Sequence, residues 1–182
     1  QGDFPRIELA PGTVEEAYEA GWRAFNLAER YQCPVIVLSD HNLATSLRDL
    51  PPEALDFAAV QVDRGALLSE ADLDALEGEY LRHRITEDGI SPRALPGHPK
   101  AVYATASDEH DERGHICEEA QNRARQMDKR MRKLETARAE MRPPVRYGPE
   151  EADYTFLCWG STYGPLREAV DLLNADGVRA NL

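Results

Sequence analysis

Residues 33–38 read C-P-V-I-V-L, a continuous apolar run that ends where Ser39 and Asp40 begin. A short run rich in β-branched residues predicts a buried strand of a parallel sheet. Just upstream, T-V-E-E at residues 13–16 has the spacing of a capping box and predicts a helix that runs to about Tyr31. A helix followed by a buried strand is half of a repeating α/β unit, so the sequence predicts an α/β fold with a parallel sheet.

Polar residues follow the predicted strand directly. Ligands of open α/β sheets gather at the carboxyl ends of the strands, which makes Ser39, Asp40 and His41 candidates for ligand contacts. The simpler alternative is that Asp40 caps the turn that follows.

The end of the chain repeats the α/β pattern. We expect a strand at 154–159, a glycine turn at 160–164, a helix at 165–174 and a second strand after Gly177. The turn could present a helix N-terminus to an anion, but an ordinary tight turn of an α/β unit is the simpler and favoured interpretation. With residues 147–153 as a linker, we assign residues 1–146 to a first domain and 147–182 to the truncated start of a second.

The middle of the chain is less regular. We expect a helix from Ser69 to about His83, a strand at 101–106 and a long helix at 117–141. The apolar stripe of the long helix should pack on its own domain or on a partner subunit, and it comprises Ala120, Ala124, Met127, Met131, Leu134, Ala137 and Met141.

Residues 84–97, R-I-T-E-D-G-I-S-P-R-A-L-P-G, match neither a helix nor a strand period. Long loops inside compact domains are commonly functional or disordered, and the apolar residues in this one argue against disorder. Arg93 follows Ser91-Pro92, so a restricted backbone could present its guanidinium to a carboxylate in bidentate fashion. A structural salt bridge is the alternative.

His110 and His115 lie in the acidic segment 108–115. Imidazole and carboxylate groups can share a divalent ion, but the spacing matches no recognised metal motif. A polar network, a subunit contact or a histidine offered to an acidic substrate are the other interpretations.

Charge and cysteine content narrow the class of protein. The 182 residues carry a formal net charge of −12, which argues against non-specific binding of nucleic acid or anionic membranes. Cys33, Cys117 and Cys158 form no C-x-x-C pair, so we expect reduced thiols in a cytoplasmic protein rather than a cluster or zinc site. No apolar run approaches the length of a membrane span.

Six phrases, taken together and in order, resemble one family. They are Gly2–Arg6 with Leu9–Gly12, then Pro34–Asp40, T-E-D-G-I-S-P-R at 86–93, Asp108–Glu112 with Gly114-His115, Lys129–Glu135, and Trp159–Gly164. This set is similar to the alpha subunit of 2-oxoacid:ferredoxin oxidoreductases, especially the 2-oxoglutarate type.

The resemblance implies a thiamine-diphosphate enzyme that oxidatively decarboxylates a 2-oxoacid with coenzyme A to an acyl-CoA, passing electrons to ferredoxin. It implies part of a pyrimidine-side domain, followed by the start of a domain like the transketolase C-terminal domain. A beta subunit would supply the diphosphate and Mg²⁺ site and the iron–sulfur cluster. In this setting we expect Arg93 to contact the substrate carboxylate with Ser91 as support, and His110 or His115 as secondary candidates.

Two departures limit the expectation. The family's Tyr-Pro-x-Thr-Pro motif and the glutamate that activates the cofactor are not found in these residues, so we expect a segment of a longer subunit that is inactive alone. The competing hypothesis is a non-catalytic interaction or assembly module built around the long helix.

Overall fold

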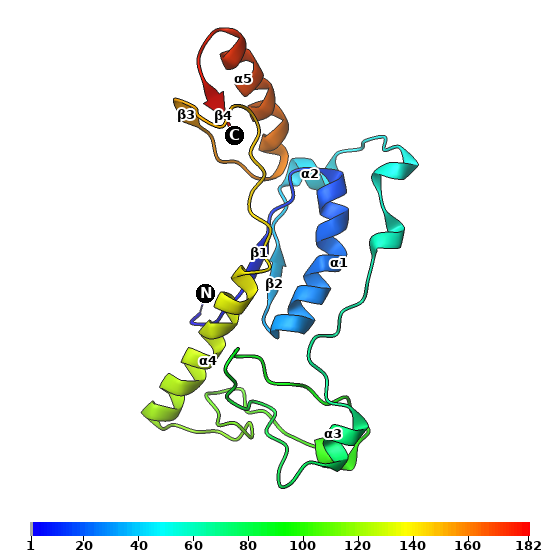
Figure 1. Ribbon diagram of the computed structural model, residues 1–182, viewed down its shortest axis with the longest axis vertical. Coiled ribbons are helices and arrows are strands. Elements are labelled where there is room, and N and C mark those ends of the chain that lie inside the picture. The colour runs from blue at the N-terminus through cyan, green and yellow to red at the C-terminus, as the bar shows by residue number, and fades with distance from the viewer. Residues whose placement is uncertain (1) are drawn as a thin grey trace. The chain divides into compact units, whose positions relative to one another are not determined.

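The computed structural model describes residues 2–182, and these form two compact units. The first unit contains residues 2–7, 26–34 and 62–141; the second contains residues 8–25, 35–61 and 142–182. Figure 1 traces the chain from β1 (Ile7–Leu9) through α1 (Val14–Tyr31) to β2 (Val35–Val37) and onward.

The opening β-α-β arrangement follows the predicted pattern. The flanking bonds, from Ile7 N to the Pro34 carbonyl (3.1 Å) and from Leu38 N to the Leu9 carbonyl (2.8 Å), run in the parallel sense. At the start of α1, Thr13 Oγ1 accepts from Glu16 N (3.2 Å), while the Glu16 carboxylate reaches back to Gly12 N (2.7 Å). The predicted helix start and strand are therefore confirmed.

The burial predicted for β2 is wrong. Ile36 and Val37 are 40% and 41% exposed, and the sheet formed with β1 has two strands among the described residues. An apolar run is buried on both faces only where other elements cover both faces, and within residues 2–182 such cover is missing.

Short elements follow β2 in the second unit. They are α2 (His41–Thr45), η1 (Pro52–Ala54) and η2 (Phe57–Ala59). Further along the chain, the second unit holds β3 (Tyr154–Thr155), η4 (Gly160–Thr162), α5 (Tyr163–Ala175) and β4 (Ala180–Asn181). Strands β3 and β4 are parallel, with Tyr154 opposite Ala180, which confirms the predicted β-α-β unit.

Residues 62–119 of the first unit are mostly irregular. Two helical turns interrupt them, α3 (Glu70–Asp74) and η3 (Pro99–Ala101). The helix begins as predicted, at Ser69, where Ser69 and Asp72 form a capping box. It ends at Asp74 rather than near His83, and Gly78 beyond it has a positive φ of 87°. The predicted strand at 101–106 is wrong, because its backbone pairs with no strand within residues 2–182.

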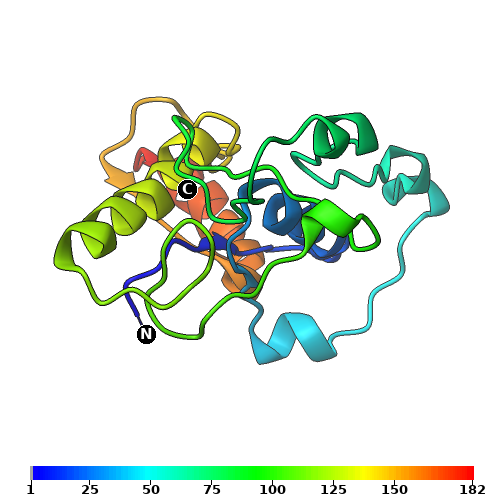
Figure 2. The same ribbon diagram turned by 90° about the horizontal axis from the view of Figure 1, so that it is seen from below.

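The long helix is present as α4 (Ala120–Arg138), slightly shorter than predicted. Figure 2 shows loops of the first unit running beside α4. Bonds from Arg132 to the Thr86 carbonyl (3.0 Å) and from Thr136 Oγ1 to the Asp88 carbonyl (3.0 Å) hold the 84–93 loop there. The loop is thus fixed by the helix rather than by strands.

Gly89 marks the closest approach of this loop to α4. Its φ is +80°, and a Cβ at this position would clash with the Lys129 carbonyl oxygen and lie 3.1 Å from Lys133 N. Only glycine tolerates both this dihedral angle and this contact.

None of the helices among residues 2–182 combines the length and the apolar character needed to cross a bilayer.

Candidate functional site

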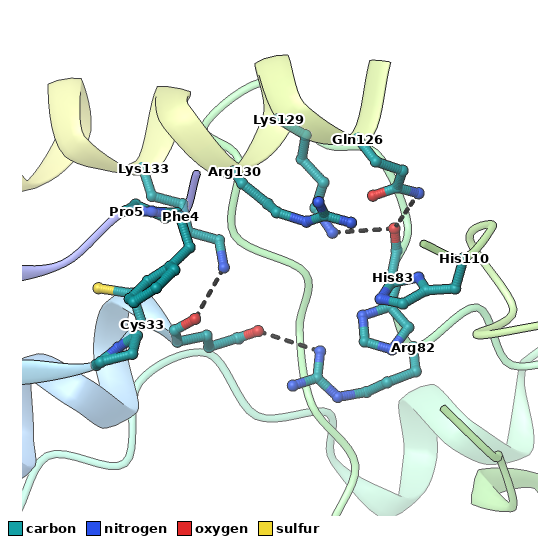
Figure 3. A pocket seen from close by; sticks show the side chains of 12 residues that line it. Phe4, Pro5, Cys33, Arg82, His83, His110, Gln126, Lys129, Arg130 and Lys133 are labelled. Carbon is teal, nitrogen blue, oxygen red and sulfur yellow. Dashed lines mark hydrogen bonds between the residues drawn. The ribbon is translucent and has the colours of Figure 1, made fainter. Parts of the chain in front are cut away.

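A cavity of about 230 Å³ lies within the first unit, between α4, the loops and the end of α1 (Figure 3). Its lining is dominated by nitrogen-bearing side chains. The lining residues are Phe4, Pro5, Gln32, Cys33, Pro34, Arg82, His83, His110, Gln126, Lys129, Arg130 and Lys133.

The buried face of α4 is polar, contrary to the sequence-based expectation. Asn122, Gln126, Lys129 and Lys133 are 4%, 1%, 4% and 7% exposed, and they recur at helical spacing with Ala137. Of the predicted apolar stripe, Ala120, Ala124 and Met131 are exposed, Met127, Leu134 and Met141 are half-buried, and only Ala137 is buried. The stripe therefore does not form the contact of α4 with its own unit.

Carbonyl and amide oxygens hold the cations of the cavity. Lys129 Nζ donates to the His83 carbonyl (2.9 Å), and Lys133 Nζ donates to the Gln32 carbonyl (2.9 Å). Arg82 donates to the side-chain oxygen of Gln32 at 3.1 Å (Figure 3). These acceptor oxygens are all neutral, so they satisfy hydrogen-bond donors of the three cations without neutralising their positive charge.

Arg130 is the exception, because it forms an ion pair with the Glu109 carboxylate. This pairing holds the pKa of Glu109 below its usual range. Among residues 2–182, Arg82, Lys129 and Lys133 have no such carboxylate partner.

Burial lowers the pKa of both lysines. Desolvation is the main cause for Lys129, whose pKa falls to about 7, and nearby cations add to the effect. Desolvation likewise lowers the pKa of Lys133 to about 8. Both pKa values therefore lie close to neutral pH, so a small change in local charge decides whether each lysine is protonated.

Two imidazoles contact each other at one side of the cavity, with their planes tilted by 39°. The rings of His83 and His110 have centroids 4.0 Å apart. Desolvation, together with the neighbouring His110, lowers the pKa of His83 to about 3, so this ring is neutral at physiological pH. A ring nitrogen of His83 contacts Thr105 Oγ1 (2.9 Å), and His110 Nδ1 contacts the Asp111 carbonyl (2.9 Å).

His110 is the one sequence-predicted site residue that lines the cavity. Ser91 is buried and donates from Oγ to the Arg84 carbonyl (2.8 Å). Arg93 forms an ion pair with Glu29 and donates to the Arg64 carbonyl (2.8 Å). Ser91, Arg93 and His115 therefore do not line the cavity.

His115 belongs to a turn organised by Asp111. The Asp111 carboxylate accepts from the backbone N–H groups of Arg113 (2.8 Å), Gly114 (3.1 Å) and His115 (3.0 Å). Among residues 2–182, no group of three His, Cys, Asp or Glu side chains is placed to hold a metal ion.

In the second unit, Asp40 fulfils the structural alternative considered for it. Its carboxylate accepts from Leu43 N (2.9 Å), which caps α2, and from Ser161 N (2.5 Å) at the glycine turn before α5. These backbone donors, first Leu43 and then Ser161, lower the pKa of Asp40. The turn therefore does receive an anion, and that anion is the side chain of Asp40 itself.

Sequence reasoning missed Arg82, His83, Gln126, Lys129 and Lys133. One signal was available. Two of the three lysines in this acidic chain are four residues apart, on the same helix face as Gln126 and Asn122. A polar stripe opposite an apolar one indicates two candidate buried faces, and the apolar stripe alone does not choose between them.

The fold and its sequence define the family. Residues 1–129 match the pyruvate flavodoxin/ferredoxin oxidoreductase, thiamine-diphosphate-binding family, and the chain belongs to it.

Relatives agree on the subunit. The chain is 40% identical over 178 residues to the alpha subunit of 2-oxoacid:ferredoxin oxidoreductase 1 from Sulfurisphaera tokodaii, covering 96% of this chain and 27% of that protein. It is 27% identical over 180 residues to the 2-oxoglutarate synthase subunit KorA of Methanothermobacter marburgensis, covering 98% of this chain and 45% of that one.

A solved structure matches the whole chain. This is the 2-oxoglutarate:ferredoxin oxidoreductase of Magnetococcus marinus with 2-oxoglutarate, coenzyme A and succinyl-CoA bound, at 34% identity and a TM-score of 0.81. The match covers 100% of this chain and 30% of that one. The recognition of an oxidoreductase alpha-subunit segment with an α/β fold is confirmed, and the chain spans about a quarter to a half of its relatives' length.

The cavity does not fit thiamine diphosphate by itself. Its lining among residues 2–182 contains no carboxylate that could face an aminopyrimidine ring, and cations and imidazoles dominate it. We therefore assign no step of cofactor chemistry to these residues.

Proposed function

We propose that this chain is part of a thiamine-diphosphate-dependent 2-oxoacid:ferredoxin oxidoreductase that acts on 2-oxoglutarate. The observation that carries the proposal is the match of the whole of this chain, at 34% identity, to 30% of the chain of an enzyme with 2-oxoglutarate and coenzyme A bound. In this proposal the enzyme works in the cytoplasm, and a beta subunit supplies Mg²⁺ and an iron–sulfur cluster. The domain assignment, 1–146 and 147–182, belongs to the same proposal.

The direct test uses the complete alpha subunit assembled with its partner. We expect reduction of ferredoxin that requires both 2-oxoglutarate and coenzyme A and yields succinyl-CoA. Reduction with pyruvate but not with 2-oxoglutarate would reject the substrate, and absence of reduction with any 2-oxoacid would reject the activity.

Arg93 remains our candidate for the substrate carboxylate, with Ser91 supporting the backbone and His110 or His115 as secondary contacts. The alternative is a structural role, in which Arg93 forms the ion pair with Glu29. A substrate-binding role and a structural role for Arg93 predict different effects of removing the Glu29 carboxylate.

Two variants separate these roles in the complete enzyme. If Arg93 contacts substrate, Arg93→Ala should raise the KM for 2-oxoglutarate by about tenfold or more, since a charge-assisted hydrogen bond is lost. Glu29→Gln leaves the guanidinium in place and should change KM little. Equal effects of both variants, or an unchanged KM in Arg93→Ala, would remove Arg93 from the substrate site.

The apolar stripe of α4 supports a subunit contact. Met131 is 45% exposed and Ala120 and Ala124 are exposed, while the opposite face of the helix is buried. An apolar helix face that its own unit leaves uncovered suits the packing surface of another subunit. We propose this stripe as part of the contact with the beta subunit.

A further inference from the structure

The cavity of the first unit buries positive charge without matching negative charge. Lys129 and Lys133 are 4% and 7% exposed, and together with Arg82 they donate to neutral oxygens. Buried cations are normally paired with an anion, because an isolated buried charge is costly. Within residues 2–182, these three cations therefore form no ion pair with a carboxylate.

The donors come from three segments and converge on one space. Arg82 comes from the loop after α3, the two lysines project from successive turns of α4, and His110 comes from the acidic segment (Figure 3). An ammonium has three N–H donors and a guanidinium has five. Each lysine uses one donor on a backbone carbonyl, and Arg82 uses one on Gln32, so most of their donors have no hydrogen-bond partner among residues 2–182 and remain for a ligand.

We propose that this cavity binds a phosphate group, either as free phosphate or as the phosphate of a larger molecule. Two ammonium groups and one guanidinium match a dianion with several acceptor oxygens better than a single carboxylate, which one arginine fork satisfies. Glu109 does not compete for the site, because it is engaged by Arg130.

The protonation behaviour of the lysines supports this assignment. The pKa of Lys129 is lowered by desolvation and then by Lys133, Arg82 and Arg130, while Glu112 acts in the opposite direction. For Lys133, desolvation and the same two arginines lower the pKa, and Cys33 opposes them. A dianion placed among these groups would raise both values and restore the charged form.

The proposal stands apart from the 2-oxoacid chemistry. It rests on the lining of one cavity, so the enzyme could act on 2-oxoglutarate while this cavity remained empty, and the cavity could bind phosphate in a subunit with another substrate.

The test is calorimetric titration of the complete alpha subunit with inorganic phosphate, at constant ionic strength in chloride. We expect saturable binding by the wild type. Lys133→Met should weaken it about tenfold or more, because a charge-assisted hydrogen bond is removed. Lys100→Met is the matched control: Lys100 also donates to backbone carbonyls, at Asp74 (2.7 Å) and Leu76 (3.0 Å), but is exposed and outside the cavity. It should bind phosphate as the wild type does.

Arg82→Gln provides a second variant that retains a hydrogen-bonding side chain, in case Lys133→Met does not fold. Crystals of the wild type soaked in selenate need no variant and should show an anomalous peak between Lys129 and Lys133. Titration with coenzyme A separates the two sources of phosphate, since its affinity falls in Lys133→Met only if the cavity holds its phosphate.

Three results would overturn the proposal. They are absence of saturable phosphate binding by the wild type, equal binding by Lys133→Met and Lys100→Met, and tighter binding of succinate than of phosphate at this cavity. The last would assign it to a carboxylate instead.

Discussion

Gly89 offers the sharpest test of how the 84–93 loop is held. Its φ of +80° and the approach of the α4 backbone are two separate obstacles to a side chain. A non-glycine residue in this region of φ costs about 1–2 kcal/mol, and forcing an extra carbon into a packed contact adds about 1–3 kcal/mol. We therefore expect Gly89→Ala to destabilise the loop and α4 by about 2–5 kcal/mol.

Gly78 is the matched control. It has nearly the same dihedral angle, +87°, but no atom would lie within 4 Å of a Cβ there. Gly78→Ala should therefore cost only the dihedral contribution, about 1–2 kcal/mol. The difference between the two variants measures the contact with α4.

Hydrogen exchange followed by mass spectrometry of the complete subunit reports both variants locally. A loss of 2–5 kcal/mol corresponds to faster exchange by about 30-fold to several thousand-fold in the amides of residues 84–93 and of α4. Gly78→Ala should accelerate exchange only near residues 75–80. Equal acceleration by the two substitutions, or an unchanged α4 in Gly89→Ala, would refute the close approach of loop and helix.

Three further predictions concern charge and assembly. The unfolded chain holds the proton of Lys129 up to about pH 10, and the folded chain releases it near its lowered pKa of about 7, so wild-type stability should rise with pH across this window. Once about 1–3 kcal/mol is subtracted for the lost hydrogen bond, Lys129→Met should stabilise the subunit by about 2 kcal/mol at pH 6 in phosphate-free buffer. In thermal melts this gain in stability should become smaller by pH 9. A stability difference that does not change with pH would contradict the prediction. The pKa of Asp40 is also lowered, but for a carboxylate this stabilises the folded chain above about pH 4, and the stabilisation is lost as pH falls below that value. The melting temperature of Asp40→Asn should therefore approach that of the wild type at pH 3. The same melting-temperature difference between the two proteins at pH 7 and pH 3 would exclude the cap. Met131→Glu should reduce co-elution of alpha and beta subunits in size-exclusion chromatography while leaving hydrogen exchange in α4 unchanged. Normal co-elution would show that the apolar stripe of α4 does not form the subunit contact.

The parts of the fold that sequence predicted are those whose partners are local. The capping contacts of Thr13 and Glu16 join residues within one turn, and the apolar run at 33–38 carries its own β preference. The segment 101–106 also has the residue types of a strand, but a strand forms only where a neighbouring strand can pair with it. The local sequence does not indicate whether such a neighbour exists.

The cavity depended on distant partners and was not predicted. Lys133 is buried because Gln32 offers it a carbonyl, and Lys129 because His83 does. Nothing in the residues around either lysine encodes these contacts, so the apolar stripe of α4 was the more conspicuous face. His110 was singled out for its chemistry alone, and the structure places it beside these lysines.

The way α4 is anchored also bears on how the first unit is made. The bond from Lys133 to Gln32 joins residues 101 apart, and that from Lys129 to His83 joins residues 46 apart. Contacts of such separation form only after long stretches of chain have been closed, which slows folding. On the ribosome, the carbonyls of Gln32 and His83 emerge well before the lysines that will bind them. The unit should therefore complete its folding late, when α4 has left the exit tunnel.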